Sequence, residues 1–166
     1  MTTTNENLAE AFAGESQANR KYLAFGKKAE EDGLPQVAKL FRAAAGAETI
    51  HAHAHLRVLG GIGETIKNLQ EAAEGEAHEF QEMYPPFLAQ AEAEGNKPAV
   101  FSFKNALAVE EIHNAMYVEA IAAVEAGGDL PAASIYLCPV CGNTVTVIPG
   151  QCPICNVPGE KFFEVK

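Results

Sequence analysis

A Glu-x-x-His motif that occurs twice constrains the fold of this chain more than any other feature. Glu48 and His51 form the first copy, and Glu110 and His113 form the second copy in the other half of the helical region. Residues three apart on an α-helix share one face, so each copy would present a carboxylate and an imidazole side by side. The repeated motif predicts two similar helical halves that each offer metal ligands.

Two single glutamates complete the ligand pattern. Glu15 precedes the first Glu-x-x-His motif, and Glu76 precedes the second motif at almost the same interval. One glutamate from each of two helices, with a Glu-x-x-His from each of two others, is the ligand set of a two-metal site in a four-helix bundle. Carboxylate and imidazole ligands without sulfur favour iron or manganese. Glu79 adds a further carboxylate, either as a seventh ligand or as the partner of a histidine.

Hydrophobic residues at three- and four-residue steps predict the four helices of this bundle. We expect them at about 7–31, 35–59, 65–94 and 99–126. Thr65 is the expected N-cap of the third helix. Pro85 and Pro86 should kink that helix or start a new segment.

Charge and hydropathy exclude several classes of partner. The chain carries 22 acidic and 12 basic residues, a net charge of −10, and it has no lysine and arginine cluster. We therefore expect no binding to nucleic acid and no binding to a membrane surface. The first residues resemble no secretory signal, and no apolar run is long enough to cross a bilayer. A cytoplasmic location is the expectation.

All four cysteines stand near the C-terminus as two Cys-x-x-Cys pairs. Cys138 and Cys141 form the first pair, and a short spacer separates it from Cys152 and Cys155. Paired knuckles of this kind bind one tetrahedral metal ion, and so short a segment needs that metal to fold. The spacing alone is equally compatible with iron and zinc.

The composition changes at residues 127–131, which mark the expected domain boundary. Residues 1–130 would form the bundle, and residues 135–166 would form a small metal domain with strands near 144–148 and 161–165. Gly142 and Asn156 follow the two knuckles, where a residue that tolerates a positive φ is required.

These motifs together resemble the rubrerythrin family. The resemblance covers nearly the whole chain and includes residues 12–18, 48–51, 75–85 and 110–117 and both cysteine knuckles. It implies a mainly α fold, in which a ferritin-like di-iron four-helix bundle precedes a small rubredoxin-like β/knuckle domain. The expected cofactors are two iron ions in the bundle and one iron, or zinc, at the cysteines.

The resemblance also implies a role for each site residue. Glu15 and Glu76 would be terminal ligands, and Glu48 and Glu110 would bridge the two iron ions. His113 would stay on one iron, whereas His51 and Glu79 would alternate on the other as its oxidation state changes. Tyr22 and Tyr117 match tyrosines near the site, although packing on the inner helix faces would also explain them.

Family members reduce hydrogen peroxide to water, so the expected enzyme is a peroxidase that protects against oxidative stress. Its electrons would enter through the four-cysteine iron from an external donor, such as a rubredoxin or an NAD(P)H-dependent reductase. One alternative is a ferroxidase or iron-handling protein like a ferritin. Another is a binding or structural protein with an inert bundle and a zinc ribbon.

The resemblance further implies a homodimer in which one chain's four-cysteine iron approaches the other chain's di-iron site. Residues 60–67 must cross the length of the bundle, yet they reach only about 26 Å at ~3.3 Å each, against roughly 30 Å required. Exchange of helices between the two subunits is therefore a hypothesis to be tested.

Overall fold

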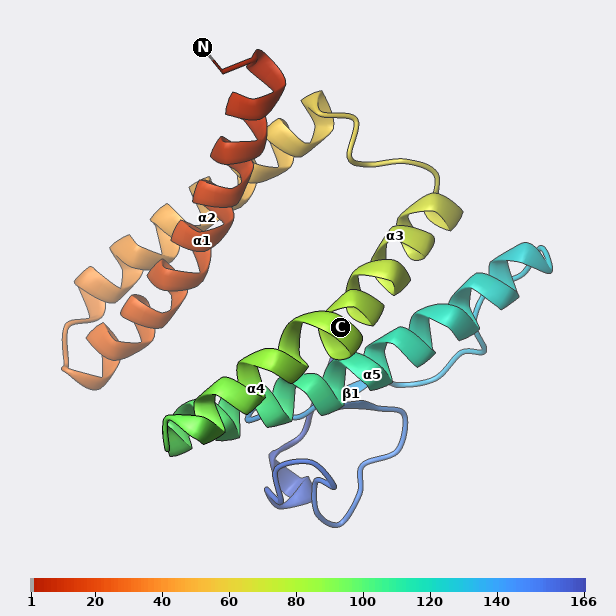
Figure 1. Ribbon diagram of the computed structural model, residues 1–166. Coiled ribbons are helices and arrows are strands. Elements are labelled where there is room, and N and C mark those ends of the chain that lie inside the picture. The colour runs from red at the N-terminus through yellow and green to blue at the C-terminus, as the bar shows by residue number, and fades with distance from the viewer. Residues whose placement is uncertain (1) are drawn as a thin grey trace. The chain divides into compact units, whose positions relative to one another are not determined.

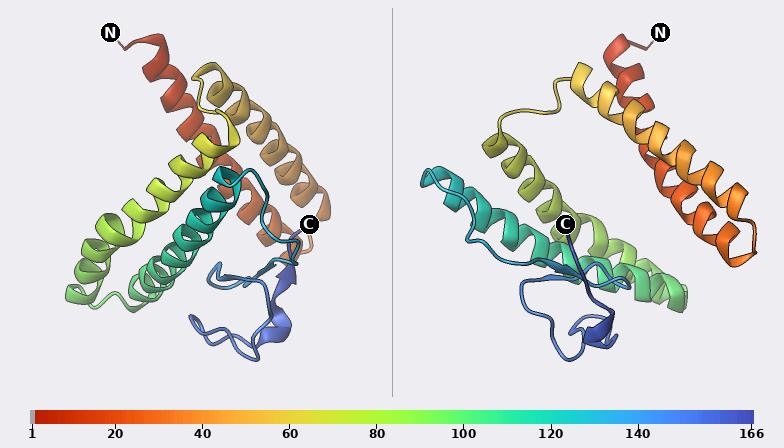
Figure 2. Two further views of the ribbon diagram at one scale, coloured as in Figure 1. Left: turned by 90° about the vertical axis from the view of Figure 1, so that its right-hand side faces the viewer. Right: turned by 180° about the vertical axis from the view of Figure 1, so that it is seen from behind.

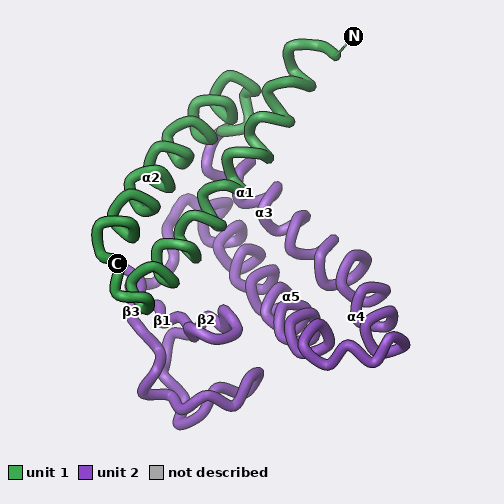
Figure 3. The backbone as a smooth tube through the Cα atoms, turned by 90° about the vertical axis from the view of Figure 1, so that its left-hand side faces the viewer, with its two compact units in different colours: residues 1–63 green, residues 64–166 purple. Residues whose placement is uncertain are grey.

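We describe residues 2–166 of the chain from a computed structural model. The chain divides into two compact units, which meet in sequence between residues 63 and 64 (Figure 3). Each unit contains a helical hairpin, and the second unit also carries a small C-terminal lobe.

The first unit is a hairpin of α1 (Thr4–Glu31) and α2 (Pro35–Val58), which run side by side in opposite directions (Figure 1). Helix α1 begins slightly earlier than expected because Thr3 and Glu6 form a capping box. Each side chain accepts a hydrogen bond from the backbone N–H of the other residue, which satisfies two donors at the helix start. Pro35 occupies the first turn of α2, where its fixed φ suits a helix start.

Small side chains form the contact between α1 and α2. Ala38, Ala45 and Ala52 recur at a regular heptad interval along α2 and are all buried. The buried Asn19 amide of α1 donates hydrogen bonds to the carbonyl oxygen of Ala45, at 2.7 Å, and to the hydroxyl of Thr49, at 2.8 Å. A buried amide needs such partners, so these two bonds fix the register of the two helices.

The second unit pairs α5 (Lys97–Glu125) with a helix in three segments, namely α3 (Thr65–His78), the π-helix η1 (Glu79–Met83) and α4 (Tyr84–Ala93). Figure 2 shows from two sides that α5 runs beside α3 and α4. The expected N-cap at Thr65 is wrong, because Glu64 occupies that position. The expectation of a new segment at Pro85 is confirmed, since the prolines stand in the first turn of α4.

The C-terminal lobe, residues 132–166, contains a small antiparallel sheet in the order β2-β1-β3. Its strands are β1 (Tyr136–Leu137), β2 (Thr144–Val145) and β3 (Phe163–Glu164), and a short 3₁₀ helix, η2 (Gly159–Lys161), precedes β3. Leu137 pairs with Thr144 on one side and with Phe163 on the other. Cys138, Cys152 and Phe162 form the buried core of the lobe. The two expected strands are present but shorter, and β1 was not expected.

These elements confirm that the fold is mainly α with a small β region at the C-terminus. Within residues 2–166, no helix has the length and apolar character required to cross a membrane.

Candidate metal centres

The first hairpin brings three of the predicted ligands together. Ligand atoms of Glu15, from α1, and of Glu48 and His51, from α2, all lie within 4.8 Å of one another. Nδ1 of His51 lies 2.9 Å from Oε2 of Glu48 and 3.8 Å from Oε1 of Glu15. Two carboxylates and one imidazole nitrogen at this separation could hold a metal ion, and they match half of the ligand set of a two-metal site.

The second hairpin repeats this arrangement with Glu76, from α3, and Glu110 and His113, from α5. Their ligand atoms also lie within 4.8 Å of one another. Nδ1 of His113 lies 2.9 Å from Oε2 of Glu110 and 3.9 Å from Oε1 of Glu76. The corresponding distances in the two hairpins are therefore nearly identical. The repeat in the sequence is also a repeat in the geometry, and each hairpin offers the same three ligands.

The other predicted site residues lie outside these two groups. Glu79 lies on the π-helix η1 and is half-buried. Tyr22 packs against Phe25 and Phe41, as expected of a residue that fills the hairpin. Tyr117 lines a pocket of about 300 Å³ with Glu76, His113, Met116 and Thr144. The catalytic roles of Glu79, Tyr22 and Tyr117 remain predictions.

The π-helix η1 accommodates one extra residue in the second half of the repeat. Tyr22 is the seventh residue after Glu15, whereas its counterpart, Tyr84, is the eighth after Glu76. Aromatic contacts support this equivalence, because Tyr84 packs against Phe87 and Phe103 as Tyr22 packs against Phe25 and Phe41 at the matching positions of the first half. The extra residue must therefore enter between Glu76 and Tyr84, where η1 is found.

Helix geometry explains why the extra residue takes the form of a π turn. Seven steps along an α-helix return to within about 20° of the starting face, but eight steps end about 80° away from it. A continuous α-helix would therefore turn Tyr84 off the face that carries Glu76. The wider turn of η1 absorbs the added residue, and it contains Glu79 itself.

Deletion of Gln81 should convert this region into a continuous α-helix. The exposed Gln81 lies inside η1, and its removal restores the spacing of the first half. We expect Glu76, Glu110 and His113 to keep their arrangement, and Glu79, three residues after Glu76, to stay on the helix face that carries Glu76. A crystal structure of the deletion variant would test this expectation, and a π turn that persists would contradict it. Deletion of the exposed Thr146 in the C-terminal lobe is the control, since it leaves η1 untouched.

Burial and charge disfavour the ionised form of Glu76 when no metal is bound. Burial raises the pKa of Glu76 above its usual value near 4.5, the carboxylate of Glu110 raises it further, and His113 partly opposes them. The carboxylates of Glu76 and Glu110 repel each other unless a cation neutralises them. The donor set of each hairpin therefore fits a metal ion.

Glu76→Gln should stabilise the metal-free chain at neutral pH. The raised pKa of Glu76 means that its contribution to stability is complete below about pH 4.5 and is lost as the pH rises through the higher folded-state pKa. Glutamine carries no such penalty. Thermal unfolding should show little difference at about pH 4 and a gain of about 0.5–2 kcal/mol at about pH 7. Glu74→Gln, an exposed change on the same helix, should show no such gain.

Tyr84 is a site residue to which the sequence reasoning assigned no role. Burial raises the pKa of its phenol, and the nearby charges of Glu79, Glu110 and Glu76 raise it further. The phenol therefore stays protonated beside three predicted ligands and can donate a hydrogen bond or a proton there. The internal repeat could have identified it as the counterpart of Tyr22.

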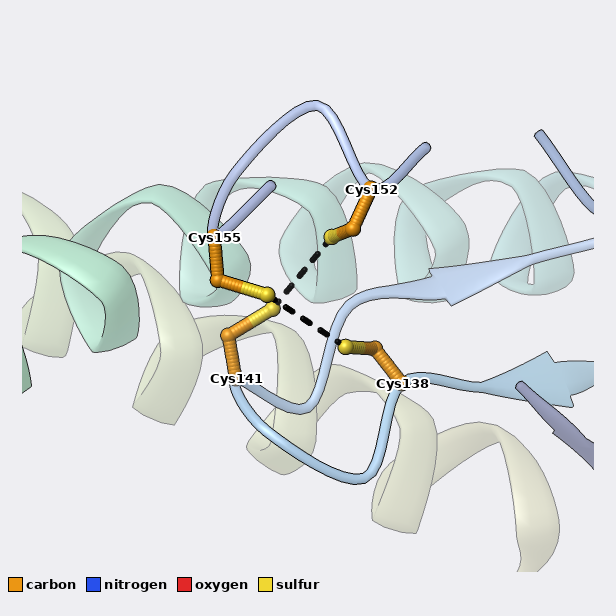
Figure 4. A group of neighbouring side chains, drawn as sticks. All are labelled: Cys138, Cys141, Cys152 and Cys155. Carbon is orange, nitrogen blue, oxygen red and sulfur yellow. Dashed lines mark hydrogen bonds between the residues drawn. The ribbon is translucent and has the colours of Figure 1, made fainter. Parts of the chain in front are cut away.

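The four cysteines form a preorganised tetrahedral site (Figure 4). The sulfur atoms of Cys138 and Cys155 are 3.6 Å apart, as are those of Cys141 and Cys152. Metal–sulfur bonds of ~2.3 Å in a tetrahedron require sulfur atoms roughly 3.8 Å apart. None of the four cysteines forms a disulfide. The predicted cysteines therefore surround a volume of the size that one iron or zinc ion needs.

Backbone N–H groups prepare one sulfur to bind a cation. Burial alone would raise the pKa of Cys152, but hydrogen bonds from the backbone N–H groups of Cys155 and Ile154 lower it to about 6. The turn that directs these groups inward needs a positive φ after each knuckle. Gly142, with φ 84°, and Asn156, with φ 64°, supply it as expected.

The chain is similar to known proteins over nearly all of its length. The sequence model of the Rubrerythrin family matches residues 6–121. Rubrerythrin-2 of Clostridium acetobutylicum is 37% identical, over 96% of this chain and 95% of the relative. Nigerythrin of Nitratidesulfovibrio vulgaris is 35% identical, over 96% of this chain and 85% of the relative. A solved structure of nigerythrin in a partially reduced state aligns with a TM-score of 0.58 at 34% identity, over 99% of this chain and 88% of that one.

The structural likeness to nigerythrin confirms the expected fold class, a ferritin-like helical region followed by a rubredoxin-like four-cysteine region. The expected cofactor, iron, agrees with the carboxylate and histidine groups, with the cysteine site and with these relatives. The chain belongs to the rubrerythrin family, whose members are in general oxidoreductases.

Proposed function

We propose that this protein is a non-haem di-iron peroxidase that reduces hydrogen peroxide to water and receives its electrons through the four-cysteine site. The observation that carries the proposal is the pair of equivalent Glu-Glu-His groups, together with a preorganised four-cysteine site in the same chain. A storage protein needs no attached site for electron entry. The donor sets therefore favour redox chemistry over iron storage.

The two Glu-Glu-His groups would combine to hold two iron ions. Glu48 and Glu110 would bridge the ions, Glu15 and Glu76 would bind as terminal ligands, and His51 and His113 would each bind through Nδ1. Glu79 would exchange with His51 as a ligand when the oxidation state changes. Cys138, Cys141, Cys152 and Cys155 would hold the third ion.

Reduced iron at the carboxylate site would supply the two electrons that convert H₂O₂ and two protons into two water molecules. The side chains around it would handle those protons. Tyr84 favours its protonated form because of its burial and the neighbouring carboxylate charges, so its phenol can donate a proton to the peroxide substrate. Tyr117 would line the approach to Glu76 and His113.

We further propose that the two hairpins of one site come from two copies of the chain. Helix α2 ends at Val58 and α3 begins at Thr65, so the connection reaches at most about 25 Å. If α3 lay beside α2 and ran in the same direction, the connection would have to span the whole length of α2. That helix has 24 residues and is about 36 Å long. Phe25 and Phe87, equivalent by the repeat, remain 48% and 46% exposed, which leaves apolar surface for a second hairpin to cover.

A complementation experiment would test this exchange. Chains carrying Glu48→Gln would be co-expressed with chains carrying Glu110→Gln. If hairpins are exchanged, each mixed dimer contains one intact site and one doubly altered site, so about half of its bundle iron should return. If each chain builds its own site, every site in the mixture carries a change and no iron should return.

The activity test is reoxidation of the iron-loaded, dithionite-reduced protein by peroxide. The proposal predicts about three iron ions per chain, two at the carboxylate site and one at the cysteines. It also predicts a red colour from iron–thiolate bonds and reoxidation by stoichiometric peroxide. Iron uptake far above this ratio would favour a ferroxidase or store, and zinc at the cysteines beside an inert bundle would favour the zinc-ribbon alternative.

A further inference from the structure

Thr144, in the C-terminal lobe, contacts a predicted metal ligand of its own chain. Its hydroxyl oxygen lies 3.1 Å from Nε2 of His113 on α5. The other ring nitrogen of His113, Nδ1, lies 2.9 Å from Oε2 of Glu110 and belongs to the ligand group. Thr144 therefore contacts the side of the imidazole that faces away from the metal position.

A second contact of Thr144 determines the direction of this hydrogen bond. The hydroxyl also lies 3.1 Å from the carbonyl oxygen of Gly142, which can only accept. A hydroxyl has one proton, so donation to Gly142 leaves its oxygen to accept from Nε2–H of His113. A neutral imidazole protonated at Nε2 has its lone pair on Nδ1, where a metal would bind.

We propose that Thr144 is a positioning residue for the metal site. It would hold His113 in the tautomer and ring orientation that present Nδ1 to the metal, as the hydrogen-bond partners of metal-binding histidines commonly do. The inference rests on the proposed two-metal site, and it adds a residue from the cysteine lobe to that site.

The same contact ties the four-cysteine site to the ligand group within one chain. Gly142 directly follows the ligand Cys141, and its carbonyl oxygen accepts the bond from Thr144. The knuckle also packs on α5. If Gly142 carried a side chain, its Cβ atom would lie 3.7 Å from Cγ1 of the buried Val109. A short chain of covalent and hydrogen bonds thus runs from Cys141 through Gly142 and Thr144 to His113. This link needs no second subunit, unlike the approach between chains that the family resemblance implied.

The test compares Thr144→Val, which removes the hydroxyl but keeps the shape, with Thr144→Ser, which keeps the hydroxyl. Thr146→Val, an exposed change in the same lobe, is the matched control. The full chain would be labelled with ¹⁵N-histidine and loaded with Zn²⁺, a redox-inert and diamagnetic probe. The first measurement is the NMR signal of the His113 Nε2–H proton and its exchange with water. The second measurement is the Zn²⁺ affinity of the bundle site, by competition with a chelator.

We expect a protected Nε2–H proton in the unaltered chain, in Thr144→Ser and in Thr146→Val, and its loss in Thr144→Val. Thr144→Val should also weaken Zn²⁺ binding at the bundle site by about 10- to 100-fold, the usual effect of removing such a partner. Retained zinc at the cysteines would show that the lobe of this variant is folded.

Two results would overturn the inference: unchanged protection and affinity in Thr144→Val, or an unprotonated Nε2 in the unaltered chain. The second result needs no variant, so it stands even if Thr144→Val does not fold. A bundle that took up no metal would end the proposed function instead. The Nε2–H proton could then still be measured in the metal-free chain, so the two failures are distinguishable.

Discussion

Cys152→Ser is expected to empty the four-cysteine site and to unfold the C-terminal lobe while the helices remain folded. Cys152 is fully buried, and backbone N–H groups lower the pKa of its thiol to about 6, so it is the sulfur best prepared to bind a cation. Serine supplies a hydroxyl that stays protonated and binds soft metals poorly. The core of the lobe, in the described part of the chain, is a cluster of Cys138, Cys152 and Phe162. A core of that size cannot fold so short a segment without its metal.

The expected loss is large because structural metal sites contribute about 10–16 kcal/mol of binding free energy in zinc-finger peptides. Metal analysis should show one ion fewer per chain, and limited proteolysis should cut within residues 132–166. The helical circular dichroism signal should persist. Val147→Ser places the same hydroxyl at a position that is 78% exposed, so it should leave the metal content and the protease resistance unchanged. A Cys152→Ser lobe that resisted protease without metal would contradict the prediction.

The metal ligands could be predicted from the sequence because local helix geometry fixes their relation. Glu48 and His51 are one turn apart on a single helix, and their atoms meet at 2.9 Å without help from the rest of the fold. The cysteine knuckles are similarly local, since each pair lies within one tight turn closed by Gly142 or Asn156. Such short-range patterns survive any arrangement of the larger elements.

The π-helix was missed because hydrophobic periodicity averages over a whole helix. One extra residue rotates all later side chains by about 100° around the helix axis. The apolar stripe expected for the third helix was broad enough to include residues on both sides of this rotation. The signal was nevertheless present, because the interval from Glu15 to Glu76 is one residue shorter than the interval from Glu48 to Glu110. A comparison of these two intervals predicts an insertion after Glu76 and directs attention to Glu79.

The role of Thr144 had no signal in the sequence. Its partner, His113, is distant in the chain and lies on another element, and a threonine in a short strand is ordinary. Packing of the lobe against α5 brings the two together, and packing between elements is what a single sequence specifies least directly. Strand β1 was missed for the same reason, since its two residues pair with strands that follow later in the chain, on both sides of it.

Glu110→Gln should remove the bundle metal while making the metal-free chain more stable. Glu110, Glu76 and His113 form one ligand group, to which each residue contributes one ligand atom. Glu110 would also bridge the two ions. A neutral amide binds iron far more weakly than a carboxylate does. Residues that merely support a ligand already contribute about 10- to 100-fold in metal affinity, so loss of a bridging ligand should reduce affinity by at least about 100-fold.

The gain in stability follows from the same charge. The Glu110 carboxylate helps to raise the pKa of Glu76, after the larger effect of burial, so its removal relieves repulsion between the two side chains. Glu111→Gln makes the same chemical change at the next residue, which is exposed, and is the control.

The two measurements are iron titration and thermal melting of the metal-free proteins. In Glu110→Gln, iron affinity should fall while the melting temperature rises. Glu110→Gln would bind little iron at the bundle and melt higher, whereas Glu111→Gln would match the unaltered chain in both. A Glu110→Gln chain that still bound two bundle irons tightly would show that Glu110 is not a ligand, because a bridging carboxylate cannot be lost without a change in affinity.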